Sequence, residues 1–125
     1  AQPDRPVLCF TGDGGIWYHL SELDTAMKCG INIVILVNNN HSLNQEKGGV
    51  EGVYGGQTPG SDELWLFPDA DFAGMAESMG CFGITVHKPS ELANALDQAF
   101  AAGKPAVVDV KTHLDGIAPQ AWTPS

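Results

Sequence analysis

Two polar clusters in the chain have the residue types and the spacing to hold a metal ion and a phosphate group. The first is the turn TGDGG at residues 11–15, and the second is the asparagine run at 38–40. Glycines that lead into a helix leave backbone N–H groups available to phosphate at the positive end of the helix dipole. Asp13 alone would repel that phosphate, because both groups are negative.

A divalent cation between Asp13 and the phosphate removes this conflict, because both groups then bind the same ion. Mg²⁺ suits such a site, since it prefers octahedral coordination by oxygen and takes few ligands from protein. An asparagine side-chain oxygen and a loop carbonyl at the tip of a neighbouring strand would complete the coordination. The two clusters therefore predict a site for Mg²⁺ and phosphate.

Other phosphate-binding turns fit the sequence less well. The dinucleotide fingerprint GxGxxG lacks its third glycine here, where Trp17 stands near that place, and no Gly-Lys-Ser/Thr follows as in a P-loop. An isolated GDGG is most often only a turn. The asparagine run that ends the next predicted strand is what favours a binding site over a plain turn.

The first elements place both clusters at strand ends. Residues 6–10 and 33–37 are apolar runs typical of buried strands, and the second run lacks alternation, as in a parallel strand covered on both faces. Apolar residues recur at helical spacing over 16–29, and Gly30 follows as a stop. This βαβ unit puts both clusters at the carboxyl ends of its strands, where open α/β sheets bind ligands.

Residues 41–68 interrupt the regular pattern. The segment contains six glycines and has no clean hydrophobic period, so we expect a long loop that is either functional or disordered. Its apolar patch at 64–67 indicates that one part docks on another surface; Trp65 and Phe67 would close over the site or pack in the core. His41 would lie near substrate or in solvent. Glu46 and Glu51 are expected to be solvated.

The remainder predicts two more helix–strand pairs in a single domain, 1–125. A helix capped by Asp69 or Asp71 runs to about Met79 and precedes a strand at 81–87. A helix from 89 to 102 then precedes a strand at 105–113. This order predicts the α/β class, with an open, doubly wound parallel sheet and helices on both faces. We expect the tail at 115–125 to run over the surface or onto a partner.

Composition restricts the partners. The formal net charge of −9 argues against binding to nucleic acid, and no apolar run approaches the roughly 20 residues that span a bilayer. The first residues, AQPDRP, lack the basic-then-apolar pattern of a signal peptide, so we expect no export. Cys9, Cys29 and Cys81 are odd in number and widely spaced, so we expect buried, reduced thiols and a cytoplasmic location.

The two clusters together resemble the diphosphate-binding motif of thiamine-diphosphate-dependent enzymes, in which GDG is followed at a distance by Asn-Asn. Here GDG spans 12–14, and the pair is Asn39-Asn40. The segments SELDTAMKCGINIVILVNNN and PDADFAGMAESMGCFGITVHKPSELANALDQAFAAGKPAVVDV are similar to the acetolactate synthase group. The resemblance therefore covers nearly the whole chain.

The resemblance implies a role for each motif residue. Asp13 and Asn40 would ligate Mg²⁺ through their side-chain oxygens, and Ser42 would add its backbone carbonyl. Asn39 could take the place of Asn40, although alignment through the helix pair Glu22-Leu23 favours Asn40. The family often has glycine where this chain has Asn44. The other cofactor-binding residues implied are the glycines of the turn, with N–H groups from the last two holding the diphosphate: Gly12, Gly14 and Gly15.

The resemblance also implies the larger enzyme, a 2-oxo-acid decarboxylase or carboligase with thiamine diphosphate and Mg²⁺ as cofactors. Its activating glutamate lies on a pyrimidine-binding domain, usually of a second subunit, so the catalytic residues are not identified here. The family's diphosphate domain begins with a strand and a helix that this sequence lacks. We therefore expect the C-terminal fragment of a multidomain homo-oligomer, inactive alone; FAD in the full-length enzyme has no support in these residues.

Two other functional classes stay open from the residues. One is a non-catalytic regulatory or interaction module that keeps this fold. The other is a flavodoxin-like domain that binds a different phosphorylated ligand. Retention of both Asp13 and Asn40 favours the enzyme, because a module freed from catalysis need not keep both ligands.

Overall fold

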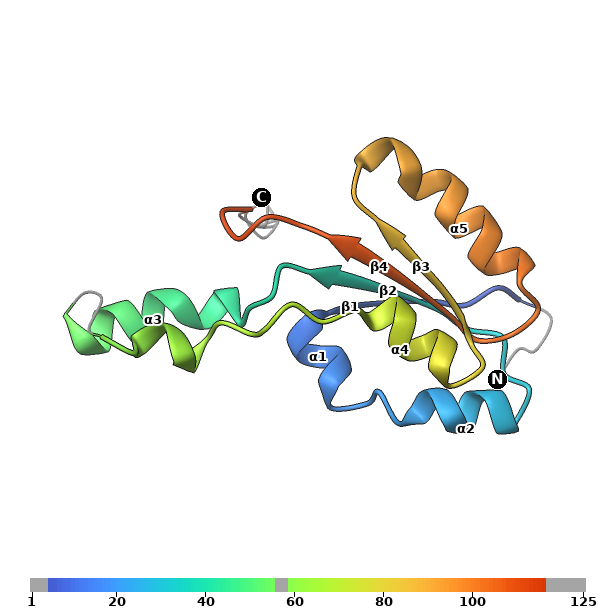
Figure 1. Cartoon of the computed structure of the whole chain (residues 1–125), viewed down its shortest axis with the longest axis horizontal. Helices are drawn as coiled ribbons and strands as arrows, with labels where there is room; N and C mark the ends of the chain where they lie inside the picture. The colour runs from blue at the N-terminus through green and yellow to red at the C-terminus, as the bar shows by residue number, and fades with distance from the viewer. Residues whose placement is uncertain (1–4, 56–58, 117–125) are drawn as a thin grey trace, which may run out of the picture.

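Four parallel strands form a single sheet in a computed structural model that describes residues 5–55 and 59–116 (Figure 1). The spatial order of the strands is β1-β2-β4-β3. Each pair of neighbours is parallel, which confirms the predicted open parallel sheet. The strands are β1 (Leu8–Gly12), β2 (Val34–Asn39), β3 (Phe82–Val86) and β4 (Ala106–Lys111).

Helices cover both faces of the sheet, as predicted (Figure 1). On one face lie α1 (Asp13–Trp17), α2 (Glu22–Lys28) and α4 (Phe72–Ser78), and on the other lies α5 (Leu92–Ala101), after a 3₁₀ turn, η2 (Pro89–Glu91). Asp71 caps α4, because its Oδ1 accepts a hydrogen bond of 2.8 Å from the Gly74 N–H.

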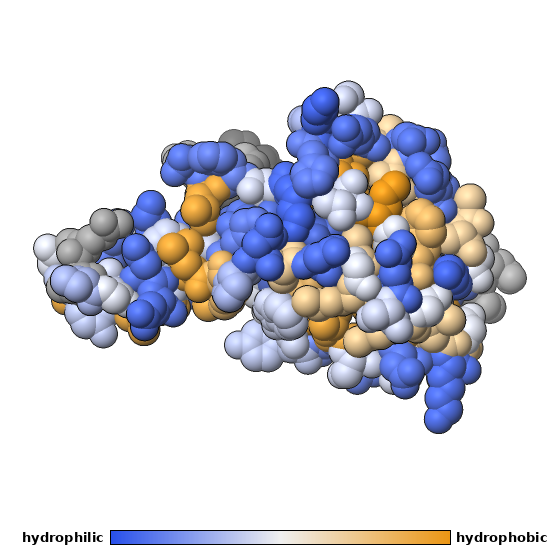
Figure 2. All heavy atoms as spheres, in the orientation of Figure 1, coloured by the Kyte–Doolittle hydropathy of each residue, from blue (hydrophilic) through white to orange (hydrophobic). Residues whose placement is uncertain are grey.

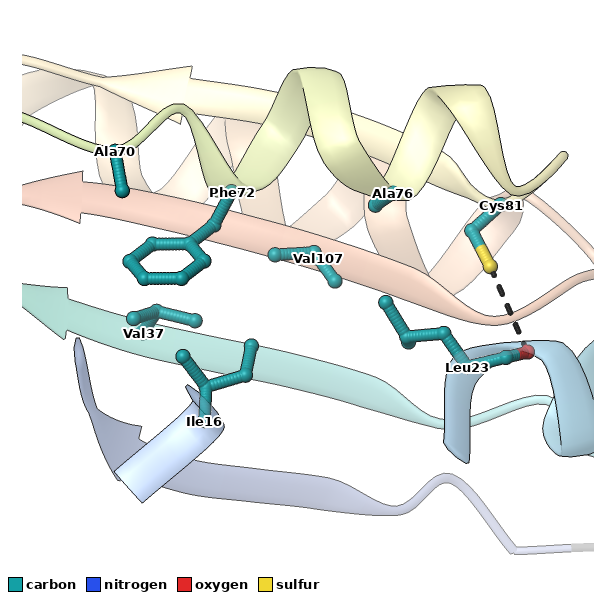
Figure 3. Close-up of a cluster of buried hydrophobic side chains, with 8 residues drawn as sticks. All are labelled: Ile16, Leu23, Val37, Ala70, Phe72, Ala76, Cys81 and Val107. Carbon is teal, nitrogen blue, oxygen red and sulfur yellow. Dashed lines mark hydrogen bonds between the residues drawn. The ribbon is translucent and has the colours of Figure 1, made fainter. Parts of the chain in front are cut away.

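Two hydrophobic cores sandwich the sheet, because successive residues of a strand point to opposite faces. Val107 belongs to the core under α4, whereas Val108 belongs to the core under α5. Figure 3 shows the first core, with Phe72 of α4 packed over the sheet. This arrangement explains why the central strands are apolar without alternation.

The single helix predicted over 16–29 is wrong, since α1 and α2 are separated by the turn 18–21. The N–H of Tyr18 bonds to Gly15 and that of His19 to Ile16, so the chain tightens and leaves the helix. Both helices still present apolar residues to the same core, among them Ile16 and Leu23. Their spacing therefore mimics one continuous helix.

The prediction for 41–68 is also partly wrong. The segment contains an 11-residue helix, α3 (Asn44–Tyr54), and a 3₁₀ turn, η1 (Ser61–Leu64). We refer to α3 and η1 together as the arm, which extends away from the sheet (Figure 1). No residue of α3 is buried, so no apolar face marks it in the sequence. In Figure 2, hydrophobic residues interrupt the polar surface of the arm near its base.

The apolar patch at 64–67 docks on the chain, as predicted. The Trp65 carbonyl accepts a 2.7 Å hydrogen bond from the Leu43 N–H, and the Phe67 N–H donates a 2.7 Å bond to the His41 carbonyl. The Trp65 side chain is buried. This segment therefore fixes the chain immediately after β2.

Two of the three cysteines contradict the prediction of buried thiols. All three are free, but Cys9 and Cys29 are exposed and only Cys81 is buried. Burial raises the pKa of the Cys81 thiol. Cys9 is exposed because β1 is an edge strand with one neighbour among the described residues.

The prediction for the C-terminal tail concerns residues that are mostly not described. Most of the predicted surface tail, 115–125, lies outside the described residues, which end at Gly116. Among the residues that the structure describes, no helix has the length and apolar content to cross a membrane.

Candidate metal and diphosphate site

The carboxyl ends of β1 and β2 bring the two polar clusters together. Gly12 pairs with Asn38 in the parallel ladder, so the residues that follow each strand emerge side by side. They line a pocket of about 310 Å³. All six predicted site residues lie in its wall: Gly12, Asp13, Gly14, Gly15, Asn40 and Ser42.

Asp13 is the first residue of α1 and is only 3% exposed. Its Oδ1 accepts a hydrogen bond of 2.8 Å from the Gly14 N–H, and its Oδ2 accepts one of 2.9 Å from the Ser42 N–H. Among the ion pairs of the described residues, none involves this carboxylate. Asp13 is therefore oriented by two backbone donors and retains lone pairs for a cation.

The two candidate asparagines point in different directions. Asn39 is fully buried, and its Nδ2 donates to Asp109 Oδ1 at 2.9 Å and to the Ala70 carbonyl at 3.1 Å. Asn40 is only partly buried and lines the pocket, where its Oδ1 accepts a 2.9 Å hydrogen bond from the Ser42 hydroxyl. This geometry favours Asn40 over Asn39 as the ligand.

The turn after Asn40 has an unusual backbone. His41 has a φ of 60°, which few residues other than glycine adopt. Its N–H donates to Asn39 Oδ1 at 3.3 Å, while its Nδ1 lies 3.5 Å from Asp69 Oδ1. His41 is not among the residues that line the pocket. The turn thus directs Asn40 and Ser42 toward Asp13.

Some residues of the pocket were missed by sequence reasoning. Gln45 and Glu46, in the first turn of α3, line its wall together with Leu43 and Asn44, whereas Asn38, which also lines it, belongs to the predicted asparagine run. The positive end of the α3 dipole therefore lies at the pocket. Asn44, where the family often has glycine, donates from Nδ2 to the Leu114 carbonyl at 2.9 Å. Nothing in the sequence indicated the α3 residues, because this helix has no apolar period.

Two larger hollows adjoin the pocket. A cleft of about 870 Å³, lined mostly by polar residue types, lies between α3 and the chain after β4, and it shares Asn38 and Asn40 with the pocket. An apolar groove of about 520 Å³ shares Gly14 and Leu43, and Trp17 and Phe67 form part of its wall. The candidate site therefore lies between a polar and an apolar surface.

The charge of the pocket fits a cation. The carboxylates of Asp13 and Glu46 line it, and no lysine, arginine or histidine is among its described lining residues. A phosphate would be repelled here unless a metal ion accompanied it. The lining residues include a carboxylate, from Asp13, and a side-chain amide, from Asn40, whose oxygens suit Mg²⁺. The residues present therefore fit a Mg²⁺–diphosphate group.

A parallel α/β sheet with such a pocket at its carboxyl edge is typical of ligand-binding α/β domains. The chain matches the family described as "Thiamine pyrophosphate enzyme, C-terminal TPP binding domain" over residues 1–110. The chain belongs to this family, as its C-terminal cofactor-binding domain, and it resembles acetolactate synthase.

Individual relatives support the same assignment. The acetolactate synthase large subunit of Haemophilus influenzae is 38% identical over 92% of this chain. The 2-hydroxyacyl-CoA lyase of Arabidopsis thaliana is 35% identical over 88% of the chain. The thiamine diphosphate-dependent 4-hydroxybenzoylformate decarboxylase of Rhodococcus jostii RHA1 has the same fold, with a TM-score of 0.79, 32% identity and 91% of this chain covered.

The match covers only part of each relative. The chain spans 19% of the length of both curated relatives and 21% of the Rhodococcus enzyme. The relatives are thus several times longer than the 125 residues described by this sequence.

Proposed function

We propose that this chain binds the diphosphate of thiamine diphosphate through Mg²⁺, as part of a 2-oxo-acid decarboxylase or carboligase resembling acetolactate synthase. The observation that carries the proposal is the buried Asp13 carboxylate, which faces the turn of Asn40 and Ser42 across two neighbouring strand ends. Membership of the thiamine pyrophosphate enzyme family supplies the identity of the cofactor.

Each residue would have a defined part. Asp13 and Asn40 would give side-chain oxygens to Mg²⁺, and the Ser42 carbonyl would give a third. Gly15 lies in the first turn of α1, where a backbone N–H has no acceptor within the helix and is available to a phosphate oxygen. The Gly14 N–H, which bonds to Asp13 Oδ1, would act mainly by orienting that carboxylate.

The reaction itself would need more protein than this chain. When bound, thiamine diphosphate supplies an electron sink for cleavage beside the 2-oxo group. We propose that the activating glutamate comes from a pyrimidine-binding domain, on the same or a second subunit of a homo-oligomer, and that the chain alone has no turnover. We also propose a cytoplasmic location. A decarboxylation rate above background for the 125-residue chain with a 2-oxo acid would contradict inactivity.

Calorimetric titration of the full-length protein with thiamine diphosphate, with and without Mg²⁺, tests the site. Wild type should bind tightly only with the metal. Asp13→Ala should weaken binding by more than the roughly 10- to 100-fold typical of losing an outer-shell partner of a metal. Asp24→Ala removes an exposed aspartate from the first turn of α2 and is a matched control that should bind like wild type.

The same titration separates the alternatives. Binding that ignores Mg²⁺, or that survives Asp13→Ala unchanged, would refute the metal-bridged site. Metal-dependent binding by a full-length protein without turnover on any 2-oxo acid would instead favour the non-catalytic module.

A further inference from the structure

A buried hydrogen-bonded chain connects the end of β4 to the turn that carries the proposed metal ligands. We propose that Asp109 is a positioning residue of this site, which acts through Asn39 to hold the 40–42 turn in its ligating conformation. The inference rests on the proposed function, because it concerns the same site, but one of its tests below requires no cofactor.

Asp109 is fully buried, and both of its carboxylate oxygens have partners. Its Oδ1 accepts the 2.9 Å hydrogen bond from Asn39 Nδ2. Its Oδ2 accepts a 3.2 Å bond from the Phe72 N–H and lies 3.1 Å from Lys111 Nζ. A buried carboxylate is costly unless it is paired and hydrogen-bonded, so this geometry is closely specified.

Lys111 lies at the other end of this series of hydrogen bonds. Its Nζ donates to the Ala70 carbonyl at 2.8 Å and to Asp69 Oδ1 at 3.1 Å. Burial of the ammonium acts to lower its pKa, but the hydrogen bonds to Asp69 and Asp109 and the attraction of their charges together outweigh that effect and raise the pKa of Lys111. The lysine therefore stays charged and compensates Asp109.

The amide of Asn39 transmits this order to the turn. An amide has donors at one end and an acceptor at the other. Because Nδ2 is committed to Asp109 and to the Ala70 carbonyl, Oδ1 must face the His41 N–H, 3.3 Å away. That bond supports the left-handed conformation of His41. The turn then places Asn40 in the pocket and the Ser42 N–H on Asp13.

Asp109→Asn tests the connection, because the new amide can accept only at one end. If the side-chain oxygen at 109 keeps its contacts with the Phe72 N–H and Lys111 Nζ, the NH₂ group at 109 faces Asn39 Nδ2. Both of these groups are donors, so no hydrogen bond forms between them. Asn39 must then rotate its amide and present NH₂ to the His41 N–H, which breaks the support of the turn. In the full-length protein, we expect the Mg²⁺-dependent affinity for thiamine diphosphate to fall by about 10- to 100-fold.

The double variant Asn39→Asp/Asp109→Asn should rescue the site. Asp at 39 accepts both from the His41 N–H and from the NH₂ at 109, while the oxygen at 109 keeps Phe72 and Lys111. The Ala70 carbonyl keeps its bond to Lys111. The His41 N–H, the Phe72 N–H and Lys111 again have acceptors, although a carboxylate oxygen now faces the Ala70 carbonyl, so affinity should recover part of the loss. This variant carries the test if Asp109→Asn does not fold.

A purely structural role for Asp109 is the competing explanation, because its Oδ2 also accepts from the first N–H of α4. Asp71→Ala is the matched control, since it removes the side-chain cap of the same helix and leaves Asn39 untouched. Asp71→Ala should lower the unfolding temperature with wild-type cofactor affinity.

Hydrogen exchange without cofactor gives an independent readout. Asp109→Asn should speed amide exchange at 39–42, whereas Asp71→Ala and the double variant should not. Wild-type affinity and exchange in Asp109→Asn, or a folded double variant without rescue of either, would overturn the inference. If wild type shows no metal-dependent binding, the proposed function fails, and the exchange result still decides whether Asp109 orders the turn.

Discussion

Adjacent asparagines at the end of β2 have different environments. Side chains alternate between faces along a strand, so Asn39 enters the core and Asn40 faces the pocket. Asn39 is held by three hydrogen bonds, whereas the Oδ1 of Asn40 bonds to the Ser42 hydroxyl. Asn39 thus stabilises the fold, whereas Asn40 is available to a ligand.

Alanine at each position should separate the two roles. Asn39→Ala leaves buried partners unsatisfied, among them the His41 N–H, and should lower the free energy of unfolding by about 1–3 kcal/mol. Asn40→Ala should leave that free energy near the wild-type value while weakening Mg²⁺-dependent cofactor binding. Chemical denaturation and calorimetry measure the two effects, and a stability loss confined to Asn40→Ala would contradict this assignment.

The sequence predicted much of the site at this scale. Aspartate, glycine and asparagine at two strand ends indicated a metal and a phosphate, and all six chosen residues line one pocket. Their roles as ligands stay predictions. Gln45 and Glu46 were missed because their positions depend on α3, which has no buried residue. Asp109 was missed because a lone aspartate in an apolar strand does not reveal its partners.

Among the elements, α4 and β3 make an especially close contact at Gly83. A Cβ there would meet the Ala73 carbonyl oxygen, which belongs to the α4 backbone. Gly83→Ala should therefore push the helix from the sheet and cost about 1–3 kcal/mol of folding free energy. Chemical denaturation gives this value.

Gly52→Ala in α3 is the matched control for this substitution. Nothing lies within 4 Å of a Cβ built there. The change should be neutral or should stabilise by about 0.4–1 kcal/mol, because alanine restricts the unfolded chain. Equal effects of the two substitutions would show that the α4–β3 contact is not the cause.

The stability that Glu91 contributes at the start of α5 is expected to depend on pH. Glu91 accepts hydrogen bonds from the His87 and Lys88 N–H groups, and these bonds hold the pKa of Glu91 below its ordinary value of 4.5. A lowered pKa in the folded state gives stability that is present above the unfolded pKa and is lost as pH falls through the folded one.

Glu91→Gln should therefore lower the unfolding temperature slightly at pH 7. The difference from wild type should shrink below the ordinary pKa of 4.5 and vanish once the folded-state carboxyl is protonated. Thermal unfolding followed by circular dichroism from pH 7 to pH 3 provides the comparison. A constant difference across that range would exclude the carboxylate as its source.

Element prediction succeeded where one face of a segment packs. The four strands and the helices α4 and α5 follow from apolar runs and helical spacing, and their bounds shift by a few residues only. The prediction of elements failed where hydrophobic periodicity does not mark a helix or its end. The turn at 18–21 is hidden because α1 and α2 share one core, and α3 is hidden because it packs on none.

At the scale of the whole molecule, β1 carries an apolar strip that is exposed among the residues the structure describes. Leu8 is 48% exposed and Phe10 is 70% exposed. They pair with Val34 and Leu36, so they lie on the sheet face that α5 covers farther along. An exposed apolar edge strand favours association with other chains. The sequence suggested buried strands, but it could not show that β1 stands at the edge of the order β1-β2-β4-β3.

The isolated chain should therefore self-associate as its concentration rises, and Leu8→Lys/Phe10→Lys should reduce that association. The unfolding temperature should change little, because the side chains are largely exposed. Asn94→Lys/Gln98→Lys, on the exposed side of α5, controls for the two added positive charges. Light scattering with size-exclusion chromatography measures the mass, and a wild-type chain that stays monomeric at all concentrations would contradict the expectation.

The pairing of Gly12 with Asn38 has a consequence for sequence variation. The gap between Asp13 and the 40–42 turn is set by the hydrogen-bond register of two strands, not by the number of residues that join them. The connection passes through the turn at 18–21, away from the pocket. Insertions or deletions there would lengthen or shorten the crossover and leave the two halves of the site at the same separation.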